Sequence, residues 1–123
     1  MAVKVLVVED DNFLRSAYQA KLSKAGFEVQ MAMDGEDALT ILNNFIPDII
    51  LLDLVMPRKD GFATLEEIKK REALQKVPVI VTSNLGQQDS IDKVKAMGAT
   101  DFITKTDLSI NDLVDKINGY VSK

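Results

Sequence analysis

The sequence predicts an α/β fold in which helices wrap a parallel sheet. One observation is a set of short apolar runs rich in β-branched residues, such as residues 3–8 and 49–52, which are typical of strands buried on both faces. A second is that segments with an apolar residue at every third or fourth position alternate with these runs. Such alternation is the pattern of a sheet whose parallel strands are joined by helices.

The pattern places five strands and five helices along the chain. The predicted strands are residues 3–8, 27–31, 48–53, 79–83 and 101–104. The predicted helices are residues 12–25, 36–44, 62–71, 88–97 and 111–121. The first helix carries an apolar stripe at Leu14, Tyr18 and Leu22, which lets one face pack on the sheet.

Several residues mark where the helices begin or end. Gly26 and Gly98 follow predicted helices, where glycine commonly closes the last turn. Pro47 marks the end of another predicted helix, and Ser109 precedes the last helix as a candidate cap.

The composition limits what the chain can do. Its 123 residues fit one domain, spanning residues 1–123, and 46% hydrophobic residues suffice for a core. The net charge of -4 argues against direct binding to nucleic acid or to an anionic membrane, both of which need a basic surface. There are no cysteines and no histidines, which excludes disulfides, thiolate zinc sites and histidine-dependent hydrolysis. With no long apolar run, we expect a cytoplasmic protein.

Acidic residues follow two of the predicted strands. Glu9, Asp10 and Asp11 come after the first strand, and Asp53 ends the third. The carboxyl ends of parallel strands lie at the edge where open α/β sheets place their chemistry, so we expect these carboxylates to converge. Their repulsion favours a shared cation, and an all-oxygen site suits Mg²⁺. Asp11 and Asn12 have an alternative interpretation, because both residue types are common helix caps.

Polar groups also stand at the ends of two other predicted strands, at the same edge of the sheet. Ser83 ends the fourth strand and offers a hydroxyl, and Lys105 follows the fifth with an ammonium group suited to phosphate. After Asp53, Pro57 fixes one backbone angle and Gly61 permits a positive φ, which predicts an ordered loop. Such a loop would let the Val55 carbonyl act as a metal ligand. Taken singly, the serine and the lysine are also explained as an ordinary turn and surface residue.

In this order and spacing the motifs resemble the receiver domains of bacterial two-component response regulators, close to the chemotaxis regulators, over essentially the whole chain. The motifs are Glu9-Asp10, Asp34-Gly35 with Ala38-Leu39, Leu52-Asp53 with Met56-Pro57, Asp60-Gly61, Pro78, Ser83, Gly98-Ala99 and Lys105. The resemblance implies a doubly wound, flavodoxin-like α/β sheet with strand order 2-1-3-4-5 and five flanking helices.

The resemblance also implies a role for each site residue. Asp53 would accept a phosphoryl group from a phosphohistidine on a partner. Asp10 and Asp53 would bind Mg²⁺ directly, together with the carbonyl of Val55, while Glu9 would act through a water molecule. The remaining site residues, Ser83 and Lys105, would contact the phosphoryl group.

A phosphorylation switch follows from the same resemblance. Ser83 would move toward the phosphoryl group while Phe102 turns inward, although Phe102 is equally explained as a packing residue. The output surface would comprise the fourth helix, fifth strand and fifth helix. The implied partners are a sensor histidine kinase or histidine phosphotransfer protein, a downstream effector or output domain, and a second copy of the chain in a phosphorylation-dependent dimer.

Two positions depart from the usual pattern of the family, and two others bear on hydrolysis of the phosphoryl group. Thr106 stands where most members have a cis proline, so we expect a trans peptide after Lys105. Asn84 replaces a small residue after the hydroxyl and would narrow access to the phosphoryl group. Val55 and Leu85 flank the approach of the hydrolytic water and cannot orient it, so we expect slow self-dephosphorylation.

Other functions fit part of the pattern. A magnesium-dependent phosphatase with an aspartyl nucleophile would need an acid two residues after Asp53, where Val55 stands. A flavin-binding electron carrier would need a phosphate cradle after the first strand, where Glu9 to Asn12 would repel phosphate. A receiver-like protein that only binds partners is disfavoured because the phosphorylation residues are all present.

Overall fold

One parallel sheet organises the chain, with strand order β2-β1-β3-β4-β5, and this confirms the predicted topology. The computed structural model describes residues 2–54, 60–83, 88–104 and 109–121. The strands are β1 (Lys4–Val8), β2 (Glu28–Ala32), β3 (Ile49–Asp53), β4 (Val79–Ser83) and β5 (Asp101–Thr104). The helices are α1 (Asn12–Lys24), α2 (Gly35–Leu42), α3 (Gly61–Lys70), α4 (Gln88–Ala96) and α5 (Ile110–Val121).

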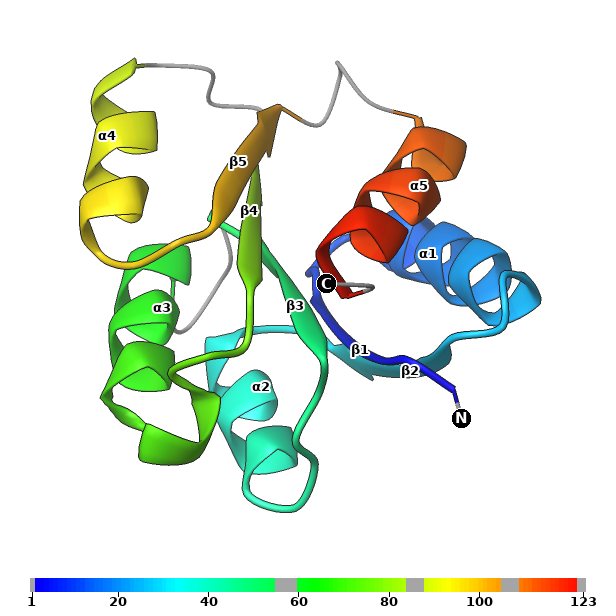
Figure 1. Cartoon of the computed structure of the whole chain (residues 1–123), viewed down its shortest axis with the longest axis horizontal. Coiled ribbons are helices and arrows are strands. Elements are labelled where there is room, and N and C mark those ends of the chain that lie inside the picture. Colours follow the sequence, from blue (N-terminus) through cyan, green and yellow to red (C-terminus); the bar gives the residue numbers. More distant parts are fainter. Residues whose placement is uncertain (1, 55–59, 84–87, 105–108, 122–123) are drawn as a thin grey trace.

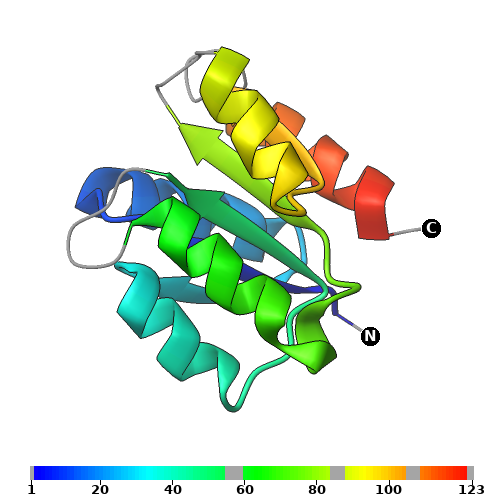
Figure 2. The same cartoon turned by 90° about the vertical axis from the view of Figure 1, so that its left-hand side faces the viewer.

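Helices cover both faces of the sheet. Helices α1 and α5 lie on one side, and α2, α3 and α4 lie on the other (Figure 1). The view turned by 90° shows the second group in front of the sheet (Figure 2). Within the residues that the structure describes, no helix has both the length and the hydrophobicity needed to span a bilayer.

The alternation of side chains along the strands divides the core into two layers. Val5 and Val7 of β1 point into the layer beneath α1 and α5, whereas Leu6 and Val8 point into the layer beneath α2, α3 and α4. Strand β3 divides in the same way. Every residue of β3 is buried, which explains why its sequence is continuously apolar up to Asp53.

Glycines close two helices as predicted. Gly26 and Gly98 have φ angles of 95° and 104°, a region that glycine adopts without a steric cost. After α1, the N–H of Gly26 donates to the Ser23 carbonyl at 3.0 Å, and the N–H of Phe27 donates to the Leu22 carbonyl at 3.1 Å. This pair of bonds is the Schellman motif.

The closure of α1 explains why β2 begins one residue later than predicted. We expected a strand over 27–31, and the structure has Glu28–Ala32. Because the Phe27 N–H completes the helix end, its backbone still belongs to the turn.

A single 3₁₀ turn that the sequence did not predict, η1 (Glu72–Leu74), follows α3. Arg71 leaves the helix with an extended ψ of 119°, and the short turn then buries Leu74 in the core. The predicted cap of α5 is confirmed, because the Ser109 hydroxyl accepts the Asp112 N–H at 3.2 Å.

A polar contact fixes α5 against β5. Asp101 Oδ2 accepts the Tyr120 hydroxyl at 2.7 Å and lies 2.9 Å from the Lys116 ammonium. Burial by itself raises the pKa of Asp101, but hydrogen bonds from Lys116, Tyr120 and the Phe102 N–H outweigh it, so the pKa lies below its ordinary 3.8. Burial, and then the bond to Asp101, raises the pKa of Tyr120 to about 12.

The lowered pKa of Asp101 makes part of the stability depend on pH. The ionised carboxylate stabilises the fold above its unfolded-state pKa, and this contribution disappears as the pH falls through the lower folded-state value. We therefore expect wild type to exceed Asp101→Asn in free energy of unfolding near neutral pH. The difference should shrink steadily from about pH 5 to below about pH 3. Urea unfolding at a series of pH values measures it, and a difference that does not vary with pH would contradict this contact.

Candidate functional site

Three carboxylates meet at the carboxyl edge of the sheet. Glu9, Asp10 and Asp53 each offer an oxygen atom, and these atoms lie within 4.8 Å of one another. Strands β1 and β3 are hydrogen-bonded neighbours, with Val8 opposite Leu52, so the residues that follow them are brought together. The predicted convergence of these acids is confirmed.

The surroundings make this cluster costly without a cation. Glu9 and Asp53 are only 1% and 3% exposed, whereas Asp10 is exposed. Two unit negative charges at 4.8 Å repel by about 3 kcal/mol at an effective dielectric constant near 20. An all-oxygen set of carboxylates matches the ligand preference of Mg²⁺, so the described residues fit this ion.

The backbone after β1 holds Glu9 in place. Its N–H donates to the Ala32 carbonyl of β2 at 3.0 Å, and its carboxylate accepts the Asp11 N–H at 3.2 Å. Asp11 in turn accepts the Leu14 N–H at 3.0 Å and caps α1. The capping interpretation of Asp11 is therefore confirmed, and its carboxylate is directed to the helix.

The sequence analysis missed Arg15. Its Nη1 donates to the backbone carbonyls of Glu9 at 3.0 Å and Asp10 at 2.9 Å, while Nη2 contacts Asn12. The rigid guanidinium thus fixes the backbone carbonyls of both residues of the acidic pair. The only signal in the sequence is an arginine in the first turns of the helix that follows two acids, and this does not reveal the contact.

Helix α3 packs directly on the end of β3 through Gly61. The Gly61 N–H donates to the Leu54 carbonyl at 2.9 Å, and Asp60 caps the helix by accepting the Ala63 N–H at 2.8 Å. A Cβ at Gly61 would lie 2.5 Å from the Asp53 carbonyl oxygen. Gly61 does not use the positive φ that a glycine permits: α3 begins there, and a side chain is excluded because the two backbones touch.

Ser83 is a neighbour of the cluster. Thr82 of β4 pairs with Asp53 of β3, and Ser83 follows as the last residue of β4. It is 1% exposed. Lys105, Val55, Asn84, Leu85 and Thr106 lie outside the described residues, so their predicted roles remain predictions.

Phe102 lies on β5 and is partly buried against the core layer beneath α2, α3 and α4. Its N–H donates to Asp101 Oδ1 at 2.8 Å, which places it beside the contact between β5 and α5. This position suits a packing residue and also a switch residue, whose movement stays a prediction.

Comparison with known proteins relates this chain to one family. Residues 5–118 match the family described as the response regulator receiver domain. The response regulator PleD of Caulobacter vibrioides is 39% identical over 106 residues, which cover 85% of this chain and 23% of PleD. The chain spans between 23% and 41% of the length of the curated relatives it matches.

Solved structures share the fold. The receiver domain of the Francisella response regulator 1452 is 30% identical, with a TM-score of 0.89 and coverage of 98% of this chain and 97% of that one. The receiver domain of the sensor histidine kinase PA1611 of Pseudomonas aeruginosa, 24% identical, has a TM-score of 0.89 with both chains fully covered (100% each). That structure has a magnesium ion coordinated in its active-site cleft.

The contact at Gly61 predicts a steric effect on the site. We expect Gly61→Ala to lower the free energy of unfolding by about 1–3 kcal/mol, because the new methyl group forces the helix away from the strand end. Gly119→Ala is the matched control, since a Cβ at Gly119 meets no atom within 4 Å. It should stabilise the protein by about 0.5–1 kcal/mol. Urea unfolding compares them, and equal effects at both glycines would contradict the account.

The position of Arg15 predicts a change in Mg²⁺ affinity. Arg15→Lys keeps the positive charge but loses the planar guanidinium, whose Nη1 reaches both carbonyls while Nη2 contacts Asn12, so we expect affinity to fall about three- to tenfold. Arg71→Gln, which removes a guanidinium whose one hydrogen bond among the described residues goes to the Asn43 side chain, should leave affinity unchanged. Calorimetric titration with MgCl₂ measures both, and unaltered affinity in Arg15→Lys would show that the clamp does not position the acids.

Proposed function

Because the chain belongs to the family of response regulator receiver domains, we propose that Asp53 accepts a phosphoryl group from a phosphohistidine of a partner protein. Receiver domains are signalling switches of two-component systems rather than conventional enzymes. The observation that supports Asp53 most strongly is its carboxylate, buried at the end of the central strand β3 within 4.8 Å of two other acids. We further propose that residues 1–123 form one receiver domain and act in the cytoplasm.

The acidic cluster is proposed to hold Mg²⁺. Asp10 and Asp53 would bind it directly, Glu9 would act through a water molecule, and the carbonyl of Val55 would complete the protein ligands. The described oxygens of Glu9, Asp10 and Asp53 support this assignment by their mutual proximity. When bound, Mg²⁺ supplies positive charge that offsets the carboxylates and the incoming phosphoryl oxygens.

The proposed transfer needs little covalent chemistry from the protein. A carboxylate oxygen of Asp53 forms a bond to phosphorus as the bond between phosphorus and the partner's histidine nitrogen breaks. Since these 123 residues include no histidine, the donor histidine lies outside them. Ser83 and Lys105 would donate to the phosphoryl oxygens, so the protein contributes orientation and charge.

The switch is proposed to begin at Ser83. Phosphorylation adds about 1.5–2 negative charges beside buried acids, which favours a rearrangement that brings donors toward the phosphoryl group. Ser83 is 1% exposed at the end of β4, and Phe102 would repack as Ser83 moves toward the phosphoryl group. The surface formed by α4, β5 and α5 would then differ between the two states.

The partners follow from this role. We propose a sensor histidine kinase or histidine phosphotransfer protein as donor, and an effector or output domain as the reader of the switch. Binding of a second copy through the α4, β5 and α5 surface is proposed to depend on phosphorylation. This chain spans less than half of the length of the curated relatives. Those relatives are therefore long enough to contain output segments beside the matched region.

Phosphorylation of Asp53 can be tested directly. With acetyl phosphate and Mg²⁺, we expect a mass gain of one phosphoryl group in wild type and none in Asp53→Asn. Asp11→Asn is the control, because an amide caps α1 as well as a carboxylate does and Asp11 is directed to the helix. It should be modified like wild type. A mass gain retained in Asp53→Asn would refute the assignment.

The lifetime of the phosphorylated protein tests the role of Val55. We expect slow dephosphorylation in Mg²⁺, because an apolar side chain cannot orient the attacking water. Val55→Asn should shorten the lifetime, and Val55→Ala should change it little. Loss within seconds in wild type, or acceleration by alanine and not by asparagine, would contradict this role.

A further inference from the structure

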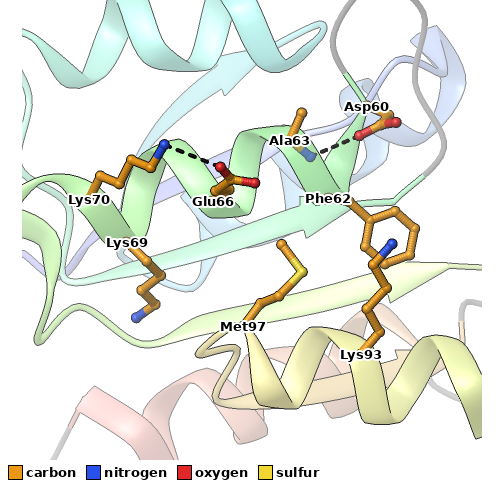
Figure 3. A pocket seen from close by; sticks show the side chains of 8 residues that line it. All are labelled: Asp60, Phe62, Ala63, Glu66, Lys69, Lys70, Lys93 and Met97. Carbon is orange, nitrogen blue, oxygen red and sulfur yellow. Dashed lines mark hydrogen bonds and ion pairs between the residues drawn. The ribbon is translucent and has the colours of Figure 1, made fainter.

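A cavity of about 600 Å³ lies between α3 and α4, away from the acidic cluster. Figure 3 shows Met97, which follows α4, pointing toward α3, and the Phe62 ring of α3 beside Lys93. These apolar side chains form its middle. The volume is within the range typical of small-molecule sites, about 300–1,000 Å³.

Two lysines with unused donors border the cavity. Lys93 Nζ lies 4.2 Å from the centroid of the Phe62 ring, and among the described residues the one hydrogen bond of Lys69 Nζ goes to the Val77 carbonyl, at 3.5 Å. An ammonium group carries three donors, so each retains capacity for an anion. Lys69 is half-buried, which lowers the pKa of its ammonium, and a negative partner would stabilise the charged form.

The acids that border the cavity already have partners. Glu66 pairs with Lys70 at 3.1 Å, and Asp60 accepts the Ala63 N–H at 2.8 Å. Two acids and three lysines line the cavity, so its net charge is +1, in a chain whose net charge is -4. An apolar middle flanked by cations is complementary to an anion with an apolar body.

Both walls of the cavity connect to the phosphorylation site. Helix α3 begins at Gly61, whose backbone touches the end of β3 at Asp53. Helix α4 begins at Gln88, soon after Ser83 ends β4. A change in the distance between α3 and α4 would therefore displace the ends of β3 and β4.

We propose that this cavity binds a small organic anion with an apolar or aromatic body, and that its occupancy is linked to the state of Asp53. The linkage rests on the proposed function, whereas the binding site does not. Linkage is reciprocal, so an anion that prefers one spacing of α3 and α4 must bind differently to the activated protein. Inorganic phosphate lacks the apolar body and should bind poorly.

The test uses 8-anilinonaphthalene-1-sulfonate as the anionic probe and N-phenyl-1-naphthylamine as its uncharged analogue. Titration followed by fluorescence and amide NMR should show saturable binding of the sulfonate, with shifts concentrated on α3 and α4. The uncharged analogue should bind more weakly. Lys69→Gln and Lys93→Gln should each weaken sulfonate binding about threefold or more.

Lys21→Gln is the matched control, since it removes the same charge from the exposed side of α1. It should leave the affinity unchanged. Binding that is scattered over the surface, equal for both probes, or weakened equally by all three lysine variants would overturn the site. Melting curves establish that each variant is folded.

A final measurement separates this proposal from the proposed function. Beryllofluoride with Mg²⁺ imitates the phosphoryl group, and its binding should change the sulfonate affinity about fivefold or more. If beryllofluoride binds and the sulfonate affinity stays the same, the linkage is overturned while the proposed function stands. If beryllofluoride does not bind, the proposed function fails, and the sulfonate titration still decides whether the cavity is a site.

Discussion

Mutual repulsion of three carboxylates at one edge of a parallel sheet is the constraint on which this molecule depends. Because β1 and β3 are neighbours, the acids that follow them cannot avoid one another, and two are almost fully buried. Burial removes the water that would screen the charges, so positive charge close to the cluster stabilises it. The same strain makes the site responsive to a cation and to an added phosphoryl group.

The surrounding structure prevents the acids from moving apart. Arg15 holds the carbonyls of Glu9 and Asp10, and backbone contact at Gly61 holds the end of β3 against α3. Neither contact supplies a ligand to the cluster. They position it by restricting the backbone on either side, which allows the side-chain oxygens to remain close despite their repulsion.

The helices, the strands and the acids at strand ends were predictable from sequence because they depend on local patterns, whereas the strand order followed from the family resemblance. Apolar runs, helical stripes and acids at strand ends are visible in the chain, and the topology rule brings them to one edge. Arg15, the close approach at Gly61 and the 3₁₀ turn at Glu72–Leu74 were not predictable. They arise from distances between segments or from backbone angles that no sequence period encodes. Strand β2 begins one residue later than predicted because the N–H of Phe27 completes the end of the preceding helix.

The most direct measurement is the free energy of unfolding of Asp10→Asn with and without Mg²⁺. Asp10 is the exposed member of the cluster, so the amide removes one charge without opening the core. In EDTA the account predicts that the variant is more stable than wild type by roughly 1–3 kcal/mol, because repulsion is relieved. In saturating Mg²⁺ the order should reverse, because wild type binds the ion more tightly. A variant that is no more stable than wild type in EDTA would contradict electrostatic crowding as the basis of the site.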